Sequence, residues 1–126
     1  KLSRSCESVS IFDKTPTLID DIFNEAPLPN TSWKMIELMP SLWLIFFRLS
    51  WLFGYSSNTE SYKAVKKRAK LAAKKLIDLT NDNDNVLLMG HGLMNRLIIK
   101  ELLTYNFVKT KKTGNKNWSY SVLTSL

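Results

Sequence analysis

The feature that most constrains the fold is a four-residue apolar run, Val86 to Met89, that ends at a histidine between two glycines. A polar turn sequence, residues 80–85, precedes the run, and the apolar spacing from Leu93 to Tyr105 after it has the period of a helix. A short apolar run between turn signals is typical of a strand that is buried on both faces of a mainly parallel sheet. The order helix, strand, turn, helix therefore predicts an α/β domain in which helices sandwich the sheet.

The turn at His91 combines three properties of an anion-binding site. It follows the carboxyl end of the predicted strand, where open α/β sheets bind their ligands, and it begins a helix, whose free N–H groups favour negative charge. Gly90 and Gly92 let the backbone bend tightly and approach a ligand closely. A protonated His91 would add a positive charge and two donors. The pattern predicts a phosphate or oxyanion site, and the alternative is a histidine in an ordinary tight turn.

Other segments can be assigned from their local patterns. Residues 1–13 read as a helix, and residues 17–23 as a strand or a turn of helix. Pro40 suits the start of a helix and Gly54 its end. The alternation of apolar residues and serines after residue 117 predicts a final strand at a sheet edge.

The clearest helix is predicted from Ser57 to about Leu79. Ser57 and Glu60 have the spacing of a capping box, which puts the helix cap at Ser57. One apolar stripe with spacings of three and four runs behind it, formed by Tyr62, Val65, Ala69, Ala72, Ala73, Leu76 and Ile77. Lysines cover much of the remaining surface.

The chain has 126 residues, a length that suits one domain, and we expect a single domain over 1–126. It starts at Lys1 with a segment that reads as the middle of a domain, so we expect the natural chain to begin upstream. Cys6 is the one cysteine, which excludes an internal disulfide and fits a reducing, cytoplasmic location. The net charge of +7 favours an anionic partner: a phosphorylated substrate, a membrane surface or nucleic acid.

The segment Leu88-Met89-Gly90-His91-Gly92 resembles the second half of the signature of the histidine phosphatase superfamily, which includes the cofactor-dependent phosphoglycerate mutases. Residues 2–8, with Arg4, resemble the start of that family's arginine-bearing helix. Residues 18–25 with the prolines that follow resemble the loop that carries its acidic residue, and residues 58–61 with Arg68 resemble the helix before its second histidine. The resemblance implies a three-layer, phosphoglycerate mutase-like α/β fold, incomplete at the N-terminus.

The resemblance also implies roles for individual residues. His91 matches the family's second histidine, which binds the phosphoryl group and stabilises the transition state, and Gly92 would help to bind phosphate. Arg4 matches the arginine that clamps phosphate. Glu25 matches the general acid that protonates the leaving oxygen, with Asp20 and Asp21 as competing candidates. Asn95 and Arg96 could line the pocket, with a structural or exposed position as the alternative.

The family's first motif, Arg-His-Gly after an N-terminal strand, is absent from this sequence. Its histidine is the nucleophile that takes the phosphoryl group covalently. We therefore expect the complete protein to hydrolyse phosphomonoesters, with a mutase as the less favoured alternative. We expect the chain on its own to be inactive. The reaction implied needs no metal or other cofactor, and its substrate is a phosphorylated small molecule.

Two further classes of function stay open. Residues 31–56 are predicted to be an insertion or lid over the pocket, and the apolar segment 42–53 is a possible peripheral membrane contact of a catalytically inactive relative. The lysine-rich helix and the basic tail could contact nucleic acid. The nucleic-acid interpretation is disfavoured, because lysine-covered helix faces are usually solvated surface and no nucleic-acid motif accompanies this one.

Overall fold

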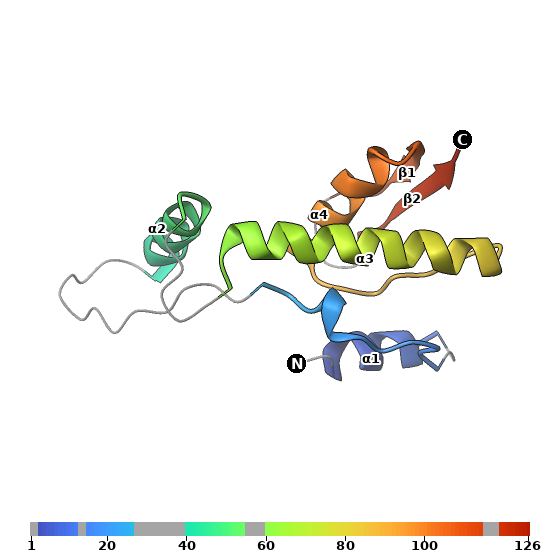
Figure 1. The fold of residues 1–126 in the computed structure, drawn as a ribbon. Coiled ribbons are helices and arrows are strands. Elements are labelled where there is room, and N and C mark those ends of the chain that lie inside the picture. The colour runs from blue at the N-terminus through green and yellow to red at the C-terminus, as the bar shows by residue number, and fades with distance from the viewer. Residues whose placement is uncertain (1–2, 13–14, 27–39, 55–59, 115–118) are drawn as a thin grey trace.

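The computed structural model describes residues 3–12, 15–26, 40–54, 60–114 and 119–126. Its elements are α1 (Ser3–Ser10), the 3-10 helix η1 (Asp21–Phe23), α2 (Pro40–Leu52), α3 (Tyr62–Asp82), α4 (Gly92–Leu103), β1 (Phe107–Lys112) and β2 (Ser121–Ser125). The long helix α3 lies at the centre (Figure 1), with α1 and η1 on one side of it and α4 with the two strands on the other.

The core forms where α3 packs against α4. The predicted apolar stripe of α3 faces inward, and Val65, Ala69, Ala72 and Ala73 have no exposed surface. Because three of these four side chains are single methyl groups, α4 can approach α3 closely, and its larger residues Met94 and Ile98 fill the interface. Phe23 and Ala26 add to the core from the η1 segment. The predicted helices at 40–54 and 93–105 are confirmed with small shifts at their ends.

The predicted start of α3 is wrong. The residue that caps the helix is Ser61, whose hydroxyl accepts a hydrogen bond from the backbone N–H of Ala64 at 3.2 Å, and not Ser57, which lies outside the described residues. Glu60 does not turn back onto a capping residue, because its carboxylate bonds to Arg68 two turns into the helix. The Glu60 carboxylate accepts two charge-assisted hydrogen bonds from the guanidinium of Arg68. In a capping box it would accept one, from a backbone N–H.

The mainly parallel three-layer sheet predicted from the sequence is not confirmed. In the part of the chain that the structure describes, the sheet consists of β1 and β2 alone. The buried strand predicted at residues 86–89 is wrong: the segment forms no strand and pairs with no described strand, and Leu87 is 74% exposed. A ladder needs a neighbouring strand at about 4.8 Å, and a cavity borders this segment instead.

The strands β1 and β2 form an antiparallel hairpin, with Phe107 opposite Ser125 and Lys112 opposite Ser121. A bulge interrupts the register between Lys109 and Lys111. The final strand was predicted, whereas β1 was missed, because its lysines suggested a solvated tail. Asn106, with a φ of 63°, supplies the left-handed turn between α4 and β1 that Asn tolerates better than most residues.

Helix α2 lies beyond the N-terminal end of α3 (Figure 1), and its Trp51 contacts the start of α3. This side chain is fully buried, donates from Nε1 to the carbonyl oxygen of Glu60 at 2.8 Å, and meets the Tyr62 ring edge-on at 5.0 Å. Gly54 ends the helix with a φ of 100°, in the left-handed region that favours glycine. Residues 31–39 of the predicted lid lie outside the described part of the chain.

Candidate active site

His91 stands at the start of α4, as the sequence predicts. It is the N-cap residue, with extended backbone angles, and its carbonyl oxygen accepts the first helical hydrogen bond from Asn95 at 2.9 Å. Its half-buried side chain forms no capping hydrogen bond. The first N–H groups of a helix have no intrahelical acceptor. This helix end therefore combines backbone N–H groups that lack an intrahelical acceptor with an imidazole that does not cap the helix, which suits an anion.

Gly90 leaves room for the side chain of Asn95 in this turn. A Cβ atom at position 90 would lie 2.6 Å from Oδ1 of Asn95, so a larger residue would push the asparagine side chain away. A Cβ at Gly92, in contrast, meets nothing within 4 Å. The two glycines thus differ: the first lets the segment before it and the helix approach each other, while the second keeps the space beside the helix start open.

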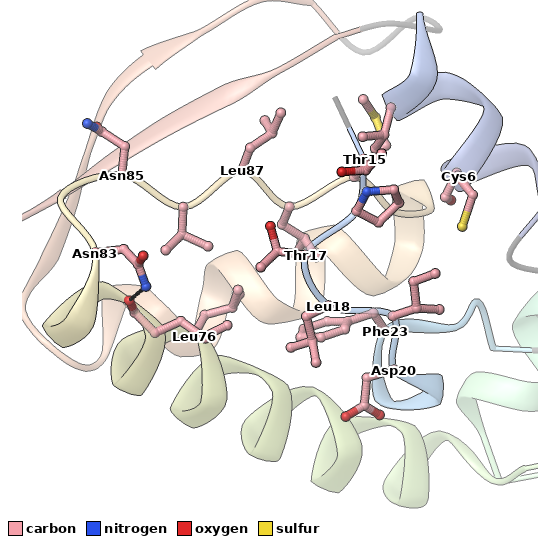
Figure 2. Close-up of a pocket in the computed structure, with 18 residues that line it drawn as sticks. Cys6, Thr15, Thr17, Leu18, Asp20, Phe23, Leu76, Asn83, Asn85 and Leu87 are labelled. Carbon is pink, nitrogen blue, oxygen red and sulfur yellow. Dashed lines mark hydrogen bonds between the residues drawn. The ribbon is translucent and has the colours of Figure 1, made fainter. Parts of the chain in front are cut away.

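A cavity of about 400 Å³, within the size range of small-molecule sites, lies next to this turn. Figure 2 shows Leu87 on one side of it and Thr17 and Leu18 on the other, with Leu76 of α3 below them. The lining is mostly apolar, and it includes residues up to Met89 but none of His91, Gly92 and Glu25. The cavity therefore borders the segment that leads to His91 and does not include the histidine itself. None of the side chains of α2 that the structure describes lines the cavity either.

The predicted partners of His91 come from two other elements. Arg4 lies in α1, and its side chain is outside what the structure describes. Glu25 follows η1 and is half-buried, and its Oε1 accepts a hydrogen bond from the N–H of Ala26 at 3.3 Å. The described contacts do not join Glu25 to His91, so the arrangement of these residues around one phosphoryl group stays a prediction.

Asp20, a competing candidate for the general acid, has a structural role. One carboxylate oxygen forms an ion pair with Lys75, and the other accepts from the N–H of Ile22 at 2.9 Å and so caps η1. The hydrogen bond from Lys75, followed by that from Ile22, lowers the pKa of Asp20. A general acid must carry its proton at the working pH, so this lowered pKa argues against Asp20 in that role.

The lowered pKa of Asp20 predicts an acid-dependent loss of stability. Since the folded-state pKa lies below the unfolded value of about 3.9, the contribution is present above that value and is lost as the pH falls through the folded pKa. Asp20→Asn should therefore lower the urea midpoint at neutral pH, and its deficit relative to the unmodified protein should shrink in acid. Asp78→Asn, an exposed change on α3, is the control. A deficit that is equal at both pH values would contradict this role of Asp20.

Arg68 joins the Glu25 segment to α3. Its guanidinium binds the Glu60 carboxylate through Nε at 3.2 Å and Nη2 at 2.8 Å. Through Nη1 it also donates to the carbonyl oxygens of Ile22 at 3.1 Å and Asn24 at 2.7 Å. Asn24 immediately precedes Glu25, so Arg68 fixes the backbone that carries the predicted acid. The sequence pointed to Arg68 through the family resemblance, but its contacts to residues 22 and 24 were missed.

Replacing Arg68 by methionine should destabilise the protein by about 2 kcal/mol, less than for a fully buried pair because both partners are partly exposed. It removes the partner of Glu60 and leaves two carbonyl groups without their donor. Urea unfolding measures the loss, with the exposed Arg96→Met as control. Amide exchange at Asn24 to Ala26 should speed up only in Arg68→Met. Unchanged exchange there would show that Arg68 does not hold this segment.

Comparison with known proteins identifies the family. A sequence model of the histidine phosphatase superfamily (branch 1) matches residues 2–125, nearly the whole chain. The chain belongs to the histidine phosphatase superfamily. No curated protein and no solved structure matches it significantly. The superfamily contains phosphatases and mutases and has the α/β phosphoglycerate mutase-like fold. The family predicted from the resemblance of residues 2–8, 18–25, 58–61 and 88–92 is confirmed.

Proposed function

We propose that this histidine phosphatase hydrolyses phosphomonoesters of small molecules and that His91 binds the transferred phosphoryl group. The observation that carries the proposal is the position of His91, an imidazole at the start of α4 that takes no part in capping the helix. Charge develops on the phosphoryl oxygens in the transition state. Preorganised donors at that point are usually the largest catalytic contribution, and the helix N-terminus and Gly92 add to them.

In the proposed reaction a nucleophilic histidine attacks phosphorus and the bond to the leaving oxygen breaks. Glu25 gives its proton to that oxygen, and Arg4 holds two phosphoryl oxygens. Water then attacks the phosphohistidine and gives a proton to the Glu25 carboxylate, and the N–P bond breaks, which releases phosphate and restores the free imidazole and the protonated acid. Because His91 is the one histidine of the sequence and is assigned to phosphate binding, the nucleophile has to come from outside these 126 residues.

A second candidate is a catalytically inactive relative that binds an anionic partner. The observation that favours it is the single histidine, since an enzyme of this mechanism needs two. The two candidates share the anion site at His91 and differ in covalent chemistry. Acid-labile phosphohistidine, formed on incubation with an aryl phosphate, would be found only if the protein carries out covalent catalysis.

The anion site can be tested in this chain, because one histidine gives one imidazole Cε1–H signal in the NMR spectrum. We expect this signal, and the amide signals of Gly92 and Leu93, to shift on titration with inorganic phosphate. Chloride at equal ionic strength is the control for general screening. If phosphate moves none of these signals beyond the chloride control, the phosphate site is not at His91.

A further inference from the structure

Helix α2 exposes apolar side chains on more than one side, Leu44 included, and one row of them is called the apolar stripe. Its members are Leu42, Ile45, Leu49 and Leu52, with Phe53 in the turn that continues the helix. Each is between 45% and 90% exposed. Their spacings of three and four place them on one face, and Trp51, the residue that attaches α2 to α3, lies on the opposite face with no exposed surface.

The helix next to it carries a lysine stripe, formed by Lys63, Lys66, Lys67, Lys70 and Lys74. All five are exposed, and they lie opposite the buried face of α3 that contains Val65 and Ala69. The lysine stripe begins in the first turn of α3, which is also where Trp51 contacts Tyr62. Helix α2 lies beyond the N-terminal end of α3 (Figure 1), so the apolar stripe and the start of the lysine stripe belong to the same end of the domain.

We propose that this end of the protein docks on an anionic membrane surface, with the apolar stripe in the acyl boundary and the lysine stripe at the lipid phosphates. A contiguous patch of exposed apolar side chains marks an interaction site. The positive charge of the lysines favours a negatively charged partner. Amphipathic segments with basic neighbours bind anionic lipids in this way. The chain's net charge of +7 adds long-range attraction to the same surface.

The length of α2 fixes how it meets the bilayer. Its 13 residues span about 20 Å, short of the roughly 30 Å hydrocarbon core. Among the described helices, none combines the length and the apolar character that crossing a membrane requires. The helix would accordingly lie in the plane of the interface. This inference does not depend on the chemistry at His91.

Sedimentation with sucrose-loaded vesicles tests the proposal on the whole chain. We expect it to sediment with vesicles of phosphatidylcholine and phosphatidylserine, weakly with phosphatidylcholine alone, and less at high salt. Leu49→Gln should weaken binding about 10-fold, because an amide replaces an apolar side chain that enters the membrane in the proposed complex. Leu71→Gln, which removes an equally exposed leucine from α3, should leave binding unchanged.

The charged arm of the test uses pairs of lysines. Lys67→Gln with Lys70→Gln should weaken binding to the phosphatidylserine vesicles about 30-fold, at roughly 1 kcal/mol per lysine near the surface. Lys109→Gln with Lys112→Gln on β1 removes the same charge and should have a much smaller effect. Circular dichroism checks that each variant folds.

Three outcomes would overturn the proposal. One is the absence of binding to either vesicle. Another is an equal loss of vesicle binding in Leu49→Gln and Leu71→Gln, which would show that the apolar stripe does not contact the membrane. The third is a concentration-dependent dimer in solution that Leu49→Gln abolishes without any vesicle binding, which would assign the stripe to a second copy of this chain.

Discussion

Replacing His91 by asparagine is expected to lower phosphomonoester hydrolysis about 10²–10³-fold, the usual cost of one transition-state donor. The measurement is kcat with an aryl phosphate, in the protein that contains the nucleophilic histidine. Asparagine is among the best residues at a helix N-cap, so α4 should start as before. The variant thus removes the imidazole while it preserves the local fold.

Asparagine at this position also separates the two interpretations of the turn. If His91 serves only to begin α4, His91→Asn should leave both stability and turnover unchanged or slightly improved. If it binds the phosphoryl group, turnover and phosphate binding should fall together while the urea midpoint stays constant. Full activity in a folded His91→Asn protein would remove His91 from the catalytic site.

The parts of the fold that could be predicted are those set by local signals. The stripe of α3, the proline and glycine at the two ends of α2, and the turn before α4 each depend on residues within a few positions of one another. The strand pairing depends on distant residues. The run at 86–89 was predicted to be a strand but forms none in the described structure, because a ladder depends on neighbours that its own sequence does not specify.

In the candidate site, too, the features set by local signals could be predicted and those set by long-range contacts could not. The place of His91 could be predicted because glycine, histidine and glycine after an apolar run carry the signal within a few residues. The role of Arg68 could not, because two of the carbonyl groups it binds lie 44 and 46 residues away in the chain. Lys75 was grouped with the solvated lysines of α3 for the same reason, although it pairs with Asp20. Long-range polar contacts of this kind have no periodic pattern.

Replacing Glu25 by glutamine should lower the hydrolysis of phenyl phosphate by about 10², whereas that of 4-nitrophenyl phosphate should change little. The phenolate leaving group is basic and needs a proton as the bond to phosphorus breaks, but 4-nitrophenolate is stable without one. Glutamine keeps an oxygen that can accept from the N–H of Ala26, so the local backbone contact survives. The difference between the two substrates therefore reports on the proton alone.

The control for Glu25→Gln is Asp21→Asn. Asp21 is a competing candidate for the general acid, and its side chain is exposed. If Glu25 is the acid, Asp21→Asn should hydrolyse both substrates at the rates of the unmodified protein. An equal loss on both substrates in Glu25→Gln would indicate that the carboxylate positions the phosphoryl group and does not donate a proton. Selective loss with phenyl phosphate in Asp21→Asn would move the acid to η1, on the segment that Arg68 holds against α3.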